Sequence, residues 1–179
     1  MEITFTRTEG PGYSIVALRD DGVLLYVPSF DRTFAFPHDL GHYVVERELG
    51  LQRGFWGAIA AGALFPGIKV LSGRQSPHAA TRSQTILREM GQQGTEAEVY
   101  LDVMLAIMNQ HAETDPARVQ RALREMWRPG KPSRDLPGCA EIQRVCNALR
   151  EAKQQWHALD AGQSLTVSWP MEARHRRKR

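Results

Sequence analysis

Alternation of apolar and polar positions at the start of the chain predicts an antiparallel meander. Residues 2–8 alternate in this way, and residues 13–18 form a second run rich in β-forming side chains. The Asp-Asp-Gly turn at 20–22 is a hairpin signal, and a third run, residues 23–27, follows it. The alternating segment 164–169 is expected to complete this sheet from the other end of the chain.

Helical spacing of apolar residues begins after the meander. It predicts a helix over 37–49, where Pro37 suits the first turn because its missing N–H costs nothing there. Gly50 is well placed as a left-handed helix ending, with Leu51 as the hydrophobic contact that accompanies it.

The stretch Gly54–Phe65 is uncharged and rich in small residues. It is too short to cross a bilayer. We expect a buried helix that packs closely against another element, such as the helix over 37–49. A contact with a membrane surface or with a second subunit is the alternative for this stretch.

The rest of the chain alternates between polar loops and helical patterns. A loop is expected over 72–83, and further helices are expected over 84–90, 95–110, 117–127 and 140–159. Thr95 and Glu98 have the spacing of a capping box at the start of one of them.

These elements indicate one α+β domain over 1–171 and a basic tail over 172–179. We expect the N-terminal antiparallel meander, joined by the C-terminal strand, to pack against a bundle of about five helices. The length of 179 residues, with 42% hydrophobic and 24% charged positions, fits a single globular domain.

The net charge of +3 comes from the tail. Its eight residues carry five Lys or Arg and one Glu, a net of +4, which leaves −1 for the rest of the chain. A short basic tail can touch nucleic acid or an anionic surface, although a solvated, disordered end is the simpler interpretation. No nucleic-acid-binding motif accompanies it.

The compartment is expected to be the cytoplasm. The first residues lack a basic segment followed by an apolar run, so we expect no secretory signal, and no segment has the length of a transmembrane span. Cys139 and Cys146 match no zinc or redox spacing, and on a helix they lie too far apart to bridge. Both are interpreted as reduced core residues.

The segment His38-Asp39-Leu40-Gly41-His42 carries the most specific chemistry. On a helix, His38 and His42 lie on one face one turn apart, so their imidazoles can reach the same divalent ion. Asp39 stands where a zincin helix (HExxH) has its general base, and it can serve as base or position a water. The helix dipole also favours an acid in a first turn without any chemistry, and either His can be an ordinary core or surface residue.

Glu46, four residues after His42, is a less direct candidate for a third ligand. From His38 to Glu46 the helix rises roughly 12 Å, too far for one ion. Glu46 is therefore expected to orient His42 or to pair with an Arg. The third ligand is expected from elsewhere in the fold, and four residues are candidates: His78, Glu98, Asp102 and His111.

Several families show similar residues. The HDxGH pattern at 38–42 resembles the metal helix of HD-domain phosphohydrolases, but that family also needs an earlier His, and none precedes His38. The HDxxH pattern is similar to the zinc motif of the ubiquinone-biosynthesis family, which expects a Glu where this chain has Gly54. Residues 36–64 resemble a group of small uncharacterised bacterial proteins with a PHDLxHxxVE core, a likeness that implies no known activity.

Two functional hypotheses follow. The first is a metal-binding protein, with zinc as the expected ion and an unknown small molecule or peptide as substrate, that acts as a hydrolase through His38, His42 and Asp39. The second is a non-enzymatic interaction module or homodimer that uses Gly54–Phe65 as its contact surface.

Overall fold

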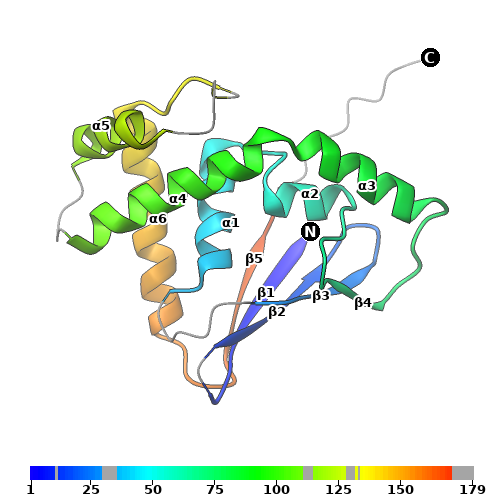
Figure 1. The fold of residues 1–179 in the computed structure, drawn as a ribbon. Coiled ribbons are helices and arrows are strands. Elements are labelled where there is room, and N and C mark those ends of the chain that lie inside the picture. The colour runs from blue at the N-terminus through cyan, green and yellow to red at the C-terminus, as the bar shows by residue number, and fades with distance from the viewer. Residues whose placement is uncertain (11, 30–35, 111–114, 128–131, 133, 171–179) are drawn as a thin grey trace.

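A computed structural model describes residues 1–10, 12–29, 36–110, 115–127, 132 and 134–170 (Figure 1). Within these residues the chain forms a five-stranded antiparallel sheet and six helices, so the predicted α+β class is confirmed. The strands are β1 (Glu2–Arg7), β2 (Tyr13–Leu18), β3 (Leu24–Val27), β4 (Lys69–Ser72) and β5 (Ser164–Ser168). The helices are α1 (His38–Leu49), α2 (Phe55–Ala61), α3 (Ala79–Met90), α4 (Gln92–Gln110), α5 (Pro116–Met126) and α6 (Cys139–His157). The predicted tail, 172–179, lies outside the described residues.

The sheet has the strand order β4-β3-β2-β1-β5. The three N-terminal strands form the expected meander, and β5 pairs antiparallel with β1, which confirms that the C-terminal strand completes the sheet. Strand β4 is an addition at the other edge that the hydropathy pattern did not indicate. Its sequence, Lys-Val-Leu-Ser, is short and mostly exposed, so it carries little of the alternation on which that prediction depends.

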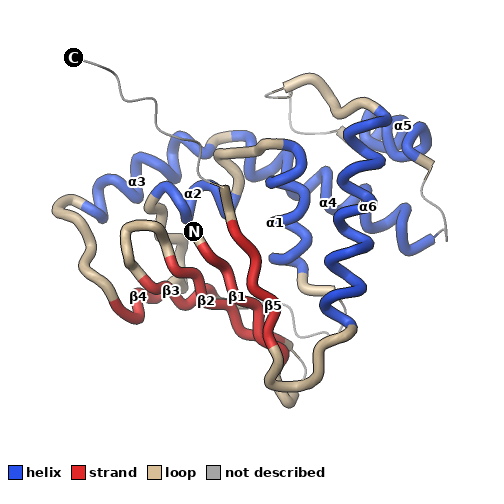
Figure 2. The backbone as a smooth tube through the Cα atoms, turned by 180° about the vertical axis from the view of Figure 1, so that it is seen from behind, coloured by secondary structure: helices blue, strands red, loops and turns tan. Residues whose placement is uncertain are grey.

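The helices lie on one side of the sheet and leave the other side open (Figures 1 and 2). The covered face supplies the core, because alternate positions such as Ile3, Phe5, Ile15 and Leu25 are fully buried. Helix α1 is central in this layer: it packs against α2, α4 and α6. Contacts with these three helices therefore fix the position of the residues on α1.

Helix α1 begins and ends nearly where the sequence indicates. Pro37 is its N-cap residue, one position before the place predicted for it, and Gly50 ends the helix in the left-handed conformation with φ 66°. The N–H of Leu51 donates to the carbonyl of Glu46 at 2.8 Å, and Leu51 is buried. This is the predicted helix ending. In it, a carbonyl group near the end of the helix that has no partner within the helix accepts a hydrogen bond from a backbone N–H beyond the helix.

Some boundaries differ from the predictions. Helix α3 begins at Ala79 and shortens the expected loop, and α4 begins at Gln92, so Thr95 lies inside the helix and does not cap it. Cys146 is a free, buried core residue as expected, but Cys139, the first residue of α6, is exposed and does not belong to the core. Among the described residues, no helix has the length and apolar character needed to cross a membrane.

The candidate metal site between helices α1 and α4

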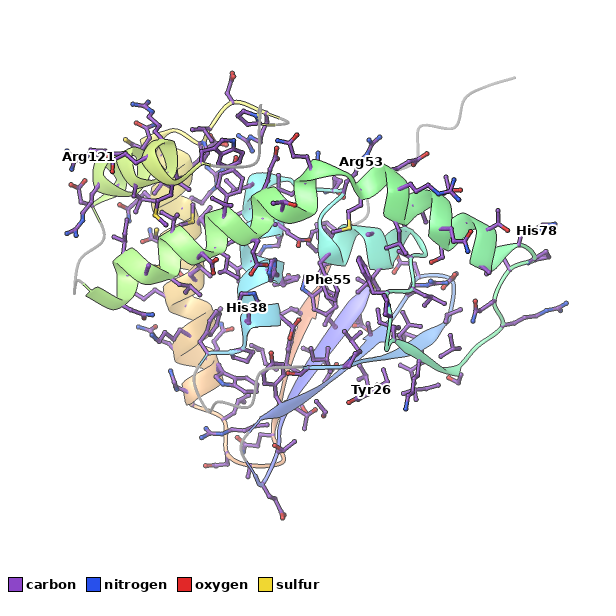
Figure 3. The ribbon with its side chains drawn as sticks, in the orientation of Figure 1. Tyr26, His38, Arg53, Phe55, His78 and Arg121 are labelled. Atoms are coloured by element: carbon purple, nitrogen blue, oxygen red, sulfur yellow. The ribbon has the colours of Figure 1, made fainter. Side chains whose placement is uncertain are left out.

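His38, His42 and Glu98 meet between α1 and α4. His42 Nε2 lies 3.1 Å from His38 Nε2 and 2.8 Å from Glu98 Oε2, and His38 Nε2 lies 3.2 Å from Glu98 Oε1. One ligand atom from each residue falls within 4.8 Å of the others, so this group could hold a metal ion. Figure 3 shows His38 beneath α4, near the centre of the molecule. The structure thus places the predicted pair together and adds Glu98 from the four candidates.

A glycine allows the two helices to approach. A Cβ atom on Gly41 would lie 2.8 Å from Cδ1 of Leu101, closer than ordinary contact allows. Leu101 is three residues after Glu98 and therefore on nearly the same face of α4. Because this face of α4 packs closely against α1 at Gly41, the Glu98 carboxylate lies next to the two imidazoles.

The three groups are electrostatically coupled. Burial lowers the pKa of His42, but the carboxylates of Glu46 and Glu98 beside its two ring nitrogens outweigh it and raise that pKa to about 9. The hydrogen bond to Glu98 also raises the pKa of His38. In turn, the two imidazoles hold the pKa of Glu98 well below its usual range. At neutral pH the metal-free site therefore holds a protonated His42 beside an ionised Glu98.

Glu46 is fully buried behind His42. Its Oε1 lies 3.5 Å from His42 Nδ1, and its two oxygens accept hydrogen bonds from the backbone N–H groups of Phe55 at 2.8 Å and Trp56 at 3.0 Å. These N–H groups are in the first turn of α2, where helix donors lack partners within the helix. Glu46 thus lies beside the outer nitrogen of His42, and its hydrogen bonds fix α2 to α1; its role as an orienting partner of His42 stays a prediction.

Asp39 lies outside the three-residue group. Its Oδ2 accepts a hydrogen bond from the hydroxyl of Tyr13, at 2.6 Å, and its main-chain carbonyl accepts one from the indole N–H of Trp56, at 2.8 Å. Burial raises the pKa of Asp39 and that of Tyr13. Sequence reasoning did not find Tyr13, whose only signal was its position in a strand with alternate burial.

The other third-ligand candidates do not join the cluster. His78 precedes α3 and lies at the far end of that helix from His38 (Figure 3). Asp102 is exposed one turn beyond Glu98 and is not part of the metal-competent group. His111 lies outside the described residues.

The Gly54–Phe65 segment is helical only over Phe55–Ala61, and it packs against α1 as expected. Trp56 is fully buried within the chain, so its ring faces the core. Phe55, Leu64 and Phe65 are half-buried and pack on the core cluster. The surface that this segment offers to a partner is consequently smaller than its composition indicated.

The arrangement combines two imidazoles and a carboxylate at one point, with a buried carboxylate behind one imidazole. Comparison with protein-family models, with curated proteins and with solved structures found no match to this chain, so its function is argued from its own residues.

Proposed function

We propose that the protein binds one divalent metal ion, with zinc as the expected ion, through His38, His42 and Glu98. The convergence of their ligand atoms is the observation that supports this proposal. In a tetrahedral zinc site with bonds of about 2.0–2.1 Å, neighbouring ligand atoms lie roughly 3.3 Å apart. Here the two imidazole Nε2 atoms lie 3.1 Å apart, and each lies near a different oxygen of Glu98, at 2.8 Å for His42 and 3.2 Å for His38.

The geometry of the two imidazoles suits a shared metal ion. Their Nε2 atoms face each other at 3.1 Å, which is a hydrogen bond when one of them lacks a proton and two opposed donors when both carry one. With a divalent ion bound, neither Nε2 atom carries a proton, because both act as electron-pair donors to the same centre. The carboxylate behind His42 fits as well, since a ligating His commonly has a carboxylate or carbonyl on its other nitrogen.

The site is accessible enough for hydrolysis. The side chains of His38 and Glu98 are 41% and 50% exposed, so solvent reaches the ligand atoms from one side. Three protein ligands leave a coordination position for water, and a metal in such a site lowers the pKa of that water toward neutrality. We propose Asp39, next to His38 and held by Tyr13, as the group that positions or deprotonates this water.

Elemental analysis of protein purified without a His-tag tests the proposal. We expect about one divalent metal ion per chain, with zinc as the main element, because three converging ligands typify metal sites of this kind. Protein that is free of metal, takes up none from micromolar zinc and melts normally would contradict it. If an activity is found, Asp39→Asn is expected to retain the metal and lose the activity.

Metal binding is expected to depend on pH. The pKa of His42 is raised to about 9, so below that pH the ion must displace its proton. Affinity should therefore rise with pH between about 6.5 and 9, by about tenfold per unit for each proton released, and level off above that range. Titrating Co²⁺ by calorimetry in buffers of different ionisation enthalpy measures the released protons. Heats that do not depend on the buffer, with an affinity constant across this range, would contradict the coupling.

A further inference from the structure

A hollow of about 320 Å³ lies between α4 and α5, and none of its lining residues belongs to the metal-competent cluster. Its volume falls within the range of roughly 300–1,000 Å³ that is usual for small-molecule sites. Figure 3 shows Arg121, one of the lining residues, on α5 at the opposite end of the molecule from His78. This hollow is thus a separate feature of the fold.

The floor of the hollow is apolar. Val103 and Ile107 of α4 are buried there, and Ala122 of α5 is half-buried. Met126 lies at the border and is 54% exposed, which makes it one of three large hydrophobic residues exposed in the described part of the chain. Methionine adapts its shape readily to apolar ligands. An aliphatic group can therefore replace water over this floor with a gain in free energy.

The rim carries positive charge. Arg118, which is half-buried, and Arg121, which is exposed, line the hollow from α5, and neither forms an ion pair with a described residue. Glu125 is the one acidic residue among the lining side chains, so the border has a net charge of +1. A guanidinium group binds a carboxylate through two parallel hydrogen bonds. The charge of the rim therefore favours an anionic head group.

We propose that this hollow binds a free amphiphilic anion: a single aliphatic chain that ends in a carboxylate. The chain lies over Val103, Ile107 and Ala122, and the carboxylate binds Arg118 and Arg121. An anionic membrane lipid has similar chemistry, but the hollow is bordered on two sides by helices and accommodates one chain more readily than a bilayer surface. This site is independent of the metal proposal.

Calorimetric titration with sodium decanoate, below its micellar concentration, tests the proposal. We expect saturable binding of one decanoate per protein and none of decyltrimethylammonium, which has the same chain and the opposite charge. Replacing Arg118 and Arg121 together by Gln is expected to weaken binding by about tenfold or more, because it removes the charge-assisted hydrogen bonds. Ala122→Phe, which fills the floor, should abolish binding.

Arg124→Gln is the matched control, because Arg124 is exposed on the same helix and does not line the hollow. It should leave decanoate affinity unchanged. Arg121 is exposed and Arg118 is half-buried, and Gln keeps part of the aliphatic stem of each, so the double Arg variant should keep its melting temperature even if Ala122→Phe does not fold. Absence of decanoate binding, equal affinity for both head groups, or an unchanged affinity in the double Arg variant would overturn the proposal. Binding to phosphatidylglycerol vesicles without binding to free decanoate would also overturn it, since the membrane would then be the ligand.

Discussion

Replacing Glu98 by Gln is expected to lower metal affinity by about 100-fold or more, because loss of even an outer partner of a ligand costs about 10–100-fold. Glu98 is the one carboxylate in the metal-competent group, and it lies on a different helix from the two imidazoles. Its side chain is half exposed, so the substitution should have little effect on packing. The measurement is competition of the purified variant with a chelator for zinc, compared with the unsubstituted protein.

Asp102→Asn provides the matched control for this result. Asp102 is an exposed acid on the same helix, one turn beyond Glu98, and should leave the affinity unchanged. Replacing both His38 and His42 by Ala should abolish the metal while the fold survives. If Glu98→Gln binds zinc as tightly as the unsubstituted protein, while the double His variant does not, the third ligand lies elsewhere.

The fold was predictable where a local pattern decides the structure. Alternation in β1 to β3 and the glycine that ends α1 are local signals, and the structure follows them closely. Helix α3 and strand β4 were less predictable. Their polar sequences form regular structure through contact with other elements, namely α2 for α3 and β3 for β4.

The candidate site, like the fold, was predictable where a local pattern decides the structure and less so elsewhere. His38 and His42 share a helix, so their spacing alone placed them together. Choosing Glu98 among the four candidate third ligands requires knowing which face of α4 contacts α1. A single sequence indicates that face only indirectly. Gly41 was the available signal, because a glycine inside a helix often marks the close approach of another element. For Tyr13, which contacts Asp39 across the fold, no comparable signal exists.

Glu46→Ala is expected to destabilise the protein by about 3 kcal/mol, because it leaves the buried N–H group of Trp56 and the part-buried N–H group of Phe55 without an acceptor. The carboxylate of Glu46 also fills the space next to Gly54, where an added Cβ would overlap its atoms. Gly54→Ala should therefore cost about 2 kcal/mol through overpacking. Both values can be measured as free energies of unfolding in urea, on metal-free protein so that zinc does not contribute.

The variant that carries both Glu46→Ala and Gly54→Ala tests whether the two positions interact. With Glu46 reduced to Ala, the three atoms that lie nearest to the Cβ at position 54 are gone, so the double variant should lose about as much stability as Glu46→Ala alone. Gly138→Ala is the control, since Gly138 also caps a helix, with φ −75°, but has no atom within 4 Å of an added Cβ. It should cost less than about 1 kcal/mol. Additive losses in the double variant would show that Glu46 and Gly54 act independently, and would contradict the steric conflict between the Glu46 carboxylate and a Cβ at position 54.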